Sequence, residues 1–359
     1  MALSQQIFRL HRISGLIAGV FLLLLSFTGS MLVFSDEIDY ALNKKHFHVQ
    51  PQGERQSLTA LYQAGLQSLP GRPYLAFSRI PKAPEDVLVM RAEYDAENKI
   101  YLYINPYTAE VVHIRGNKEY FTGALLFLHF TLLSGRNGSI VILVVAFVML
   151  IAIATGRYVY RKHVWKVLLF RDKIEWKVRR RRWRNLHRIV GVWSMVFNVL
   201  LIITGILIQW SVVGARVGKK APSVALEQPI DFDALATKAR AAIPGFDLTM
   251  IRPPRTAGLP VVFLGNAGEP KLFGELSTTI SLLPESGEVV KKNIFSEASL
   301  SAKWNAAVKP LHFGNYGGIP LKILYSLLGL APGALAVSGV LIWYRRRWMS
   351  PARKKSASV

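Results

Sequence analysis

Four histidines stand at matched positions beside four long apolar segments, and their residue type points to metal ligation. His11 and His187 occupy the same position in a repeated motif, Leu-His-Arg-Ile-x-Gly, 176 residues apart. His129 and His312 occupy a second repeated motif, Leu-His-Phe, 183 residues apart. Two facing imidazoles are the axial ligands of a six-coordinate haem. If the halves of the chain pack face to face, His11 pairs with His187 and His129 with His312, which predicts about two haem b groups.

Glycines accompany these histidines and would give a flat porphyrin room beside a helix. Gly15 and Gly191 each follow a histidine by one helical turn and lie on the same face. Other glycines recur at the two offsets, each preceded by Thr or Ser. Small residues at helical spacing also serve plain helix packing, and both interpretations stay open. The further cofactor-binding candidates are Gly29, Gly156, Gly205 and Gly339.

Basic residues near the inner histidines could bind the propionates of a haem. The candidates are Arg12, Arg157, Arg161 and Arg188. Each histidine taken alone has a simpler alternative role as an interfacial anchor for a lipid headgroup. His46 and His48 could form an outer metal site, but a solvated pair is the simpler interpretation. The chain has no cysteine, which excludes iron–sulfur clusters and thiolate metal sites.

The elements that must position these residues are membrane spans. The chain has 359 residues, of which 51% are hydrophobic, and a mean hydropathy of +0.26, which is typical of a membrane protein. Pro332 interrupts the last span and predicts a kink there. The first span exceeds the 7–15 residues of a signal-peptide core, so we expect it to remain as an anchor. The four predicted spans are residues 13–34, 139–160, 189–210 and 319–344.

The net charge of +23 is concentrated beside alternate ends of these spans. Residues 157–188 contain 13 Lys and Arg against two acids, whereas residues 35–136 contain 11 of each sign. Basic residues confined to short segments next to spans follow the positive-inside rule, so both termini and the middle loop are expected in the cytoplasm. Nucleic-acid binding is the weaker explanation of this charge. The apolar residues mixed into the middle loop predict an interfacial amphipathic helix there.

The two outer loops share one pattern. Residues 57–69 and 231–243 each predict a capped helix, followed by four short strand-like runs. The last two runs are joined by the turns Asn-Pro-Tyr-Thr at 105–108 and Pro-Glu-Ser-Gly at 284–287. Each half of the chain therefore predicts a span, an outer α+β module and a returning span, which is a tandem duplication.

These motifs in combination resemble the PepSY-associated transmembrane family of bacterial inner-membrane proteins. The resemblance rests on the Leu-His-Arg-Ile-x-Gly and Leu-His-Phe motifs, the two hairpin turns, and Asp-Glu-Ile-Asp at 36–39. It implies an α-helical membrane protein with a four-helix transmembrane core and two periplasmic α+β PepSY-like modules. The expected segments are transmembrane helix 1 (1–34), module 1 (35–118), a lead-in with transmembrane helix 2 (119–162), a basic cytoplasmic loop (163–188), transmembrane helix 3 (189–210), module 2 (211–300), a lead-in with transmembrane helix 4 (301–346) and a basic cytoplasmic tail (347–359).

The resemblance also implies a function. The family includes iron-regulated, haem-containing proteins, among them ferric-siderophore reductases, with His11, His187, His129 and His312 as the haem ligands. Some relatives carry a fused flavin reductase domain, and this sequence ends at Val359 without one, so we expect a separate cytoplasmic electron donor, possibly a flavoprotein. The acceptor would be a ferric siderophore or another periplasmic compound. Two alternatives remain: a non-redox PepSY regulatory or binding protein, and a transporter or its accessory in iron uptake.

Overall fold

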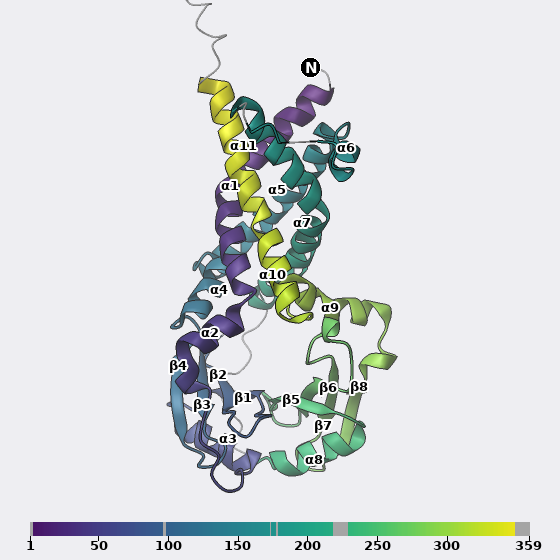
Figure 1. The fold of residues 1–359 in the computed structure, drawn as a ribbon. Helices are drawn as coiled ribbons and strands as arrows, with labels where there is room; N and C mark the ends of the chain where they lie inside the picture. Colours follow the sequence, from purple (N-terminus) through teal and green to yellow (C-terminus); the bar gives the residue numbers. More distant parts are fainter. Residues whose placement is uncertain (1–2, 96–97, 173, 177–178, 218–228, 349–359) are drawn as a thin grey trace, which may run out of the picture. The chain divides into compact units, whose positions relative to one another are not determined.

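The computed structural model describes residues 3–95, 98–172, 174–176, 179–217 and 229–348, and the chain divides into two compact units. We call them the helical unit and the α/β unit. The helical unit is drawn from Met1–Val33, Leu128–Val213 and Gly318–Val359, and the α/β unit from Phe34–Phe127 and Gly214–Gly317. The two apolar ends of each half of the chain thus belong to one unit, and the intervening loops belong to the other (Figure 1).

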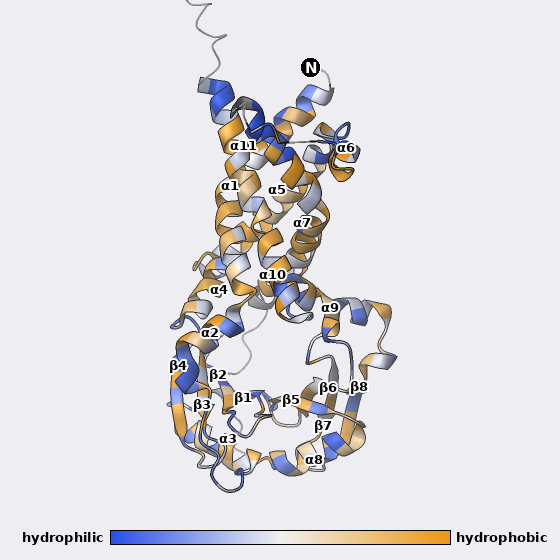
Figure 2. Ribbon diagram, in the orientation of Figure 1, coloured by the Kyte–Doolittle hydropathy of each residue, from blue (hydrophilic) through white to orange (hydrophobic). Residues whose placement is uncertain are grey.

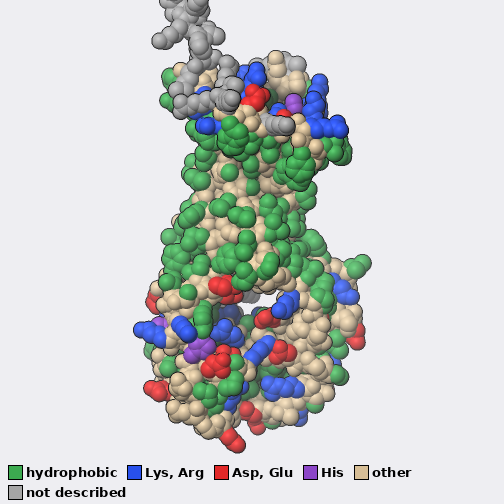
Figure 3. Space-filling view, viewed as in Figure 1, with side chains coloured by type: hydrophobic (Ala, Val, Ile, Leu, Met, Phe, Trp, Pro, Cys, Tyr) green, Lys and Arg blue, Asp and Glu red, His purple; other side chains and the backbone are tan. Residues whose placement is uncertain are grey.

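The helical unit contains four helices or helix pairs that are long and apolar enough to cross a membrane, among the residues described. Its main helices are α1 (Leu3–Leu32), α5 (Gly135–Val159), α7 (Arg179–Val217), α10 (Gly318–Gly329) and α11 (Ala331–Trp348). Hydrophobic residues dominate the middle of these helices (Figure 2), and apolar side chains cover the visible face of the unit up to an end rich in Lys and Arg (Figure 3). This distribution fits a multi-pass membrane protein.

The fourth span is broken where the sequence predicts a kink. α10 ends at Gly329 and α11 begins at Ala331, with Pro332 in the first turn of the new helix. Proline has no N–H to donate to the preceding turn, and its ring crowds the carbonyl group four residues earlier. The predicted kink is confirmed.

Small residues let α1 pack closely against its neighbours α5, α10 and α11. Ala18 is fully buried, and a Cβ atom added at Gly19 would lie 3.8 Å from the Cβ of Ala336. Polar side chains add hydrogen bonds between segments, as when the Ser30 hydroxyl donates to the Ser326 carbonyl at 2.9 Å. The Gln209 amide likewise donates to the Phe130 carbonyl of α4 (Phe121–Thr131) and to the Ser139 carbonyl of α5. Side chains of this kind replace the hydrophobic driving force that lipid does not supply.

The basic stretch before α7 contains a short helix, α6 (Val164–Leu168). Val164 and Val167 are buried, while Trp165 is exposed. The described part of the stretch that corresponds to the predicted amphipathic helix is thus five residues long. Residues 173 and 177–178 of the stretch, and the predicted basic tail from residue 349 onward, lie outside the described residues.

The α/β unit contains one antiparallel sheet of eight strands in the order β4-β3-β2-β1-β5-β6-β7-β8. Its elements are α2 (Ser35–Asn43), η1 (Lys44–His46), α3 (Leu58–Gln67), β1 (Tyr74–Arg79), β2 (Leu88–Glu93), β3 (Lys99–Ile104), β4 (Val111–Gly116), α8 (Phe232–Ala242), β5 (Asp247–Arg252), β6 (Val261–Asn266), η2 (Lys271–Phe273), β7 (Thr278–Leu282), β8 (Val289–Asn293), η3 (Phe295–Glu297) and α9 (Leu300–Phe313).

The sheet is continuous across the two predicted modules, which the sequence analysis treats as separate. β1 pairs with β5 through Phe77 and Ile251, and the Ile80 N–H donates to the Thr249 carbonyl at 3.0 Å. The pairing removes an exposed strand edge from each half. The two modules therefore form one domain with one sheet.

One hydrophobic core lies between this sheet and the helices α3 and α8. The rings of Tyr62, Phe77 and Phe232 pack together there, and the two phenylalanines are fully buried. The predicted helix starts are confirmed, because the Ser57 and Asp231 side chains accept hydrogen bonds from the first turns of α3 and α8. The core is therefore shared by both halves of the sheet.

Candidate functional site

The two inner histidines meet inside the helical unit. His11 lies on α1 and His187 on α7, and their ring centroids are 6.3 Å apart with an angle of 72° between the ring planes. Imidazole nitrogen binds transition metals at about 2.0 Å, so two such bonds plus roughly 1 Å from each nitrogen to its ring centre require centroids about 6 Å apart. The observed centroid separation matches that of two imidazoles bound to one metal.

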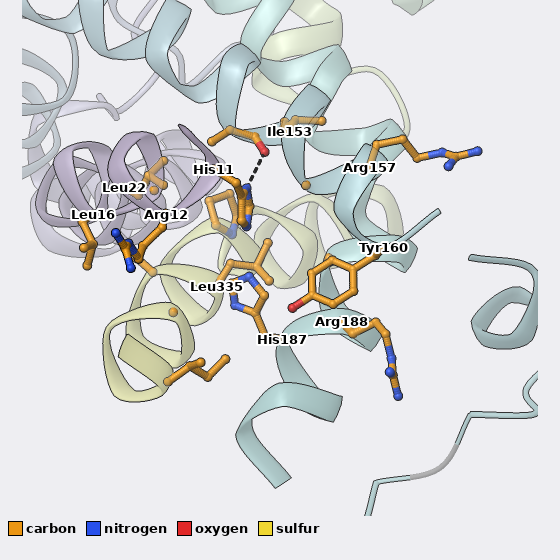
Figure 4. Close-up of a pocket in the computed structure, with 18 of the residues that line it drawn as sticks. His11, Arg12, Leu16, Leu22, Ile153, Arg157, Tyr160, His187, Arg188 and Leu335 are labelled. Carbon is orange, nitrogen blue, oxygen red and sulfur yellow. Dashed lines mark hydrogen bonds between the residues drawn. The ribbon is translucent and has the colours of Figure 1, made fainter. Parts of the chain in front are cut away.

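Both rings are oriented by the helices opposite them. The Nδ1 atom of His11 lies 3.0 Å from the Ala152 carbonyl oxygen of α5, a hydrogen bond drawn as a dashed line in Figure 4. The Nδ1 atom of His187 lies 2.8 Å from the Ser338 hydroxyl of α11. Since Nδ1 is engaged in each case, Nε2 is the nitrogen available for a ligand.

A cavity of about 600 Å³ surrounds the two histidines. Its volume lies within the roughly 300–1,000 Å³ of pockets that hold drug-sized ligands. Gly15 and Gly191 line it as predicted, and a Cβ at Gly15 would meet nothing within 4 Å. Most other lining residues are apolar, among them Leu16, Ile153 and Leu335. The cavity suits a flat apolar molecule held at its centre by two imidazoles.

Glycines also bring the histidine rings close to the neighbouring helices. A Cβ added at Gly156 of α5 would lie 3.0 Å from Cε1 of His11, and one added at Gly339 of α11 would lie 3.5 Å from Cε1 of His187. Both glycines line the cavity. Gly15 therefore leaves open space, whereas Gly156 permits an approach to the His11 ring that a side chain would obstruct.

Arginines line the cavity beside the histidines. Arg12, Arg157 and Arg188 do so as predicted, and Arg346 and Arg347 of α11 join them. In Figure 4 the Arg157 and Arg188 side chains extend away from the histidine pair. Guanidinium groups bind carboxylates such as porphyrin propionates through paired hydrogen bonds.

Arg161 is placed differently from the other predicted arginines. It is absent from the cavity lining, and its guanidinium lies 4.0 Å from the centre of the Tyr158 ring and donates to the Tyr158 carbonyl. Its predicted role in binding a propionate has no support in this geometry.

The sequence analysis missed the partner of Arg188. Asp172 accepts a hydrogen bond from Arg188 at 2.6 Å and lies 3.8 Å from the ring nitrogen of His163. The Nε of Arg188 is buried and has no hydrogen-bond partner among the described residues. An acid within a strongly basic stretch was the available signal, because a buried carboxylate there needs a cation nearby. Asp172 fixes one edge of the arginine and leaves Nε open.

His129 has surroundings like those of the inner histidines. It lies on α4, with its Nδ1 atom 2.8 Å from the Thr28 hydroxyl of α1, and a Cβ at Gly29 would lie 3.0 Å from its Cε1. His312 lies on α9 in the other unit, and Gly205 lies on α7. The pairing of His129 with His312 therefore stays a prediction.

The two histidines of the alternative outer metal site, His46 and His48, each contact a different partner. His46 lies in η1 and its ring stacks on that of His113 of β4, with centroids 3.6 Å apart, while His48 bonds to the Tyr40 hydroxyl at 2.7 Å. Among the residues described, no three His, Asp or Glu side chains gather to hold a bare metal ion.

Comparison with known families matches residues 8–346 to the PepSY-associated TM region. A comparison with curated proteins gives no match. The family match covers both histidine motifs, the whole α/β unit and every residue of the cavity lining except Arg347.

Proposed function

We propose, since the chain belongs to the family of the PepSY-associated TM region, that this multi-pass membrane protein carries haem b and passes electrons across the bacterial inner membrane. The observation that supports this most is the inner histidine pair. The ring centroids of His11 and His187 lie 6.3 Å apart, in an apolar cavity with arginines in its lining. Apolar surroundings and two neutral nitrogen ligands are what a low-spin haem needs.

Each lining residue has a role in this proposal. His11 and His187 would hold the iron through Nε2, and a bound haem would supply one-electron transfer. Gly15 and Gly191 would leave room for the ring. Arg12, Arg157 and Arg188 would bind the propionates, because guanidinium groups match carboxylates in geometry and charge. The outer candidates are Gly29, Gly205 and the pair His129 and His312. Their proposed role rests on the duplication of the chain.

The charge distribution sets the proposed direction. The basic segments would lie in the cytoplasm with both termini, so the inner pair would be the entry point for electrons. A basic face attracts an acidic donor by electrostatic steering, which suits a separate flavoprotein. The acceptor would then be periplasmic and would take electrons from the outer pair.

A ferric siderophore is the acceptor that we propose. One electron converts its iron(III) to iron(II), which binds hard oxygen chelators less tightly, and the metal is released. The protein would thus be a transmembrane oxidoreductase whose substrate is the chelated iron. No residue beyond the haem ligands is proposed to act chemically.

The first test is the haem content of the purified full-length chain. Protein from haem-replete cells should contain about two haems per chain and show the sharp α band of a low-spin haem b when reduced. His11→Ala and His187→Ala should each remove the same haem, whereas His48→Ala should retain both. A colourless wild-type preparation would refute the redox proposal and favour a regulatory binding protein.

The second test concerns direction. Chemically reduced protein in vesicles of known orientation is offered a ferric chelate on one side only. We expect reoxidation by chelate on the periplasmic side, and its loss in His312→Ala. Reoxidation confined to the cytoplasmic side would refute the proposed direction.

A further inference from the structure

Three of the four histidines face the same arrangement on a neighbouring helix, which is a hydroxyl residue followed by glycine. His129 faces Thr28 and Gly29 of α1, with Nδ1 2.8 Å from the hydroxyl oxygen. His187 faces Ser338 and Gly339 of α11, also at 2.8 Å. His11 faces Thr155 and Gly156 of α5, at the longer distance of 3.4 Å.

The protons of these hydroxyl groups are already committed to their own helices. The Thr28 hydroxyl donates to the Leu24 carbonyl at 2.8 Å, and the Ser338 hydroxyl donates to the Ala334 carbonyl at 2.8 Å. A hydroxyl has one proton and two lone pairs, so only a lone pair remains for the imidazole. The Nδ1 atoms of His129 and His187 must therefore carry the hydrogen.

The Nδ1 atom of His11 also carries the hydrogen, but its acceptor is a backbone carbonyl. The Thr155 hydroxyl donates to the Ile151 carbonyl at 2.6 Å, and Nδ1 of His11 lies 3.0 Å from the Ala152 carbonyl oxygen. A carbonyl can only accept, so Nδ1 of His11 is again the donor. Thr204 of α7 makes the same bond to the Leu200 carbonyl at 2.7 Å and precedes Gly205, so α7 repeats the pattern.

The glycine that follows each hydroxyl residue allows the ring to approach. A Cβ at Gly29 or Gly156 would lie 3.0 Å from Cε1 of the facing histidine, which is closer than ordinary van der Waals contact. The imidazole is thus held between a hydrogen-bond acceptor and bare backbone. Its position and its tautomer are both fixed by the opposite helix.

We propose that Thr28 and Ser338 are positioning residues that hold His129 and His187 as the Nδ1–H tautomer, with the Nε2 lone pair directed to a metal. This inference rests on the proposed haem function. An acceptor on Nδ1–H makes the opposite nitrogen a stronger electron donor and fixes the ring orientation. It should therefore stabilise the ferric state and lower the midpoint potential.

The test compares Thr28→Val and Ser338→Ala with variants that keep the hydroxyl, Thr28→Ser and Ser338→Thr. Loss of such a partner typically weakens metal binding by about 10–100-fold, so haem should transfer faster to apomyoglobin by a factor in this range. The midpoint potential should rise in the first set and return in the second. The matched control is Ser26→Ala, because the Ser26 hydroxyl is buried in α1 and has no hydrogen-bond partner among the described residues.

A second readout does not depend on haem. Nitrogen-15 NMR of histidine-labelled full-length protein without cofactor should show Nδ1–H tautomers, and Thr28→Val should change one of them. If haem is bound but the midpoint potential and the transfer rate are unchanged in both Thr28→Val and Ser338→Ala, the positioning role is refuted while the haem function stands. If the tautomers are as expected but no haem binds, the haem function fails instead.

Discussion

The two units bury opposite kinds of side chain. In the α/β unit the fully buried residues include large apolar ones such as Phe77, Phe232 and Phe263. In the helical unit the buried apolar cluster is small and contains Ala18, Leu22 and Ala336. Large apolar side chains there are exposed, and several hydroxyl residues are buried. The buried hydroxyl residues of the helical unit include Ser14, Ser26, Thr28, Ser30, Thr155, Ser194, Thr204 and Ser338.

The difference follows from the solvent of each unit. In water, removing large apolar side chains from the surface stabilises the fold. In lipid that driving force between helices is absent, so close packing of small residues and internal hydrogen bonds stabilise the bundle instead. A cofactor site in the helical unit can therefore be built from glycines and hydroxyl groups that the packing already requires. The predictions below test this difference, from the largest expected effect to the smallest.

Truncation of a core aromatic should have the largest effect, and it should be confined to the α/β unit. Phe77→Ala removes a fully buried ring and should lower the free energy of unfolding by about 3–5 kcal/mol. Pulse proteolysis of the full chain in detergent measures the change. Ile17→Ala is the matched control in the helical unit, since Ile17 is 59% exposed and its truncation should change little. Equal losses from both variants would contradict the contrast between the units.

In the helical unit, a methyl group added beside a histidine should lower stability, although truncation of an exposed side chain there changes little. Gly156→Ala places a Cβ 3.0 Å from His11, so His11 or α5 must shift, and overpacking of this kind destabilises by about 1–3 kcal/mol. Thermal melting and haem content should both fall. Gly339→Ala, whose Cβ would lie 3.5 Å from Cε1 of His187, should be tolerated. The same response from both glycines would show that ring contact does not set the tolerance.

Loss of a polar contact at a helix end in the α/β unit should lower the free energy of unfolding less than the two changes above. The Asp233 carboxylate accepts hydrogen bonds from Leu58 N–H, Thr59 N–H and the Thr59 hydroxyl, so α8 caps α3 in the other half of the sheet. Asp233→Ala should destabilise the unit by about 1–2 kcal/mol. Hydrogen exchange of the first turn of α3 measures this directly, with the exposed Glu288→Ala as control. Unchanged exchange at α3 would mean that the two helices are not coupled.

The smallest expected effect is a pH dependence carried by the His46 and His113 stack. Burial lowers the pKa of both imidazoles, and the charges of Lys45 and Arg115 lower each further. The folded chain then binds fewer protons than the unfolded chain, whose histidine pKa is about 6.5, so stability falls as pH drops from 6.5 through the folded pKa values. His113→Phe keeps an aromatic stack but removes one of these groups, and the loss of melting temperature from pH 7 to pH 5 should shrink. An unchanged loss would assign the effect to other groups.

Local features of the fold could be predicted from the sequence, whereas features that join distant segments could not. Ser57 and Asp231 mark the helix starts because a cap needs only its own next turn. The spans follow from hydrophobic composition, and the kink follows from the single residue Pro332. The pairing of β1 with β5 was missed, since the strands are far apart in sequence and nothing in either strand specifies its partner.

Only part of the candidate site could be predicted from the sequence. The meeting of His11 and His187 follows from the repeated motif, and the structure places the rings together. The Thr-Gly and Ser-Gly pairs were recognised as landmarks, but their hydroxyl groups had no predicted role, because the bond to Nδ1 depends on the rotation of one helix against another. Asp172 was missed for the same reason, since it meets Arg188 only when the loop folds back.

The pairing of β1 with β5 has a consequence for the synthesis of the chain. Phe77 and Ile251 are 174 residues apart, and two of the apolar spans lie between them. A ribosome adding roughly 5–20 residues per second synthesises this interval in about 10–35 s. During that time β1 is a sheet edge with unpaired N–H and C=O groups, a state that favours aggregation. The length of this exposure is set by translation and membrane insertion of the middle of the chain, and by no residue of β1 itself.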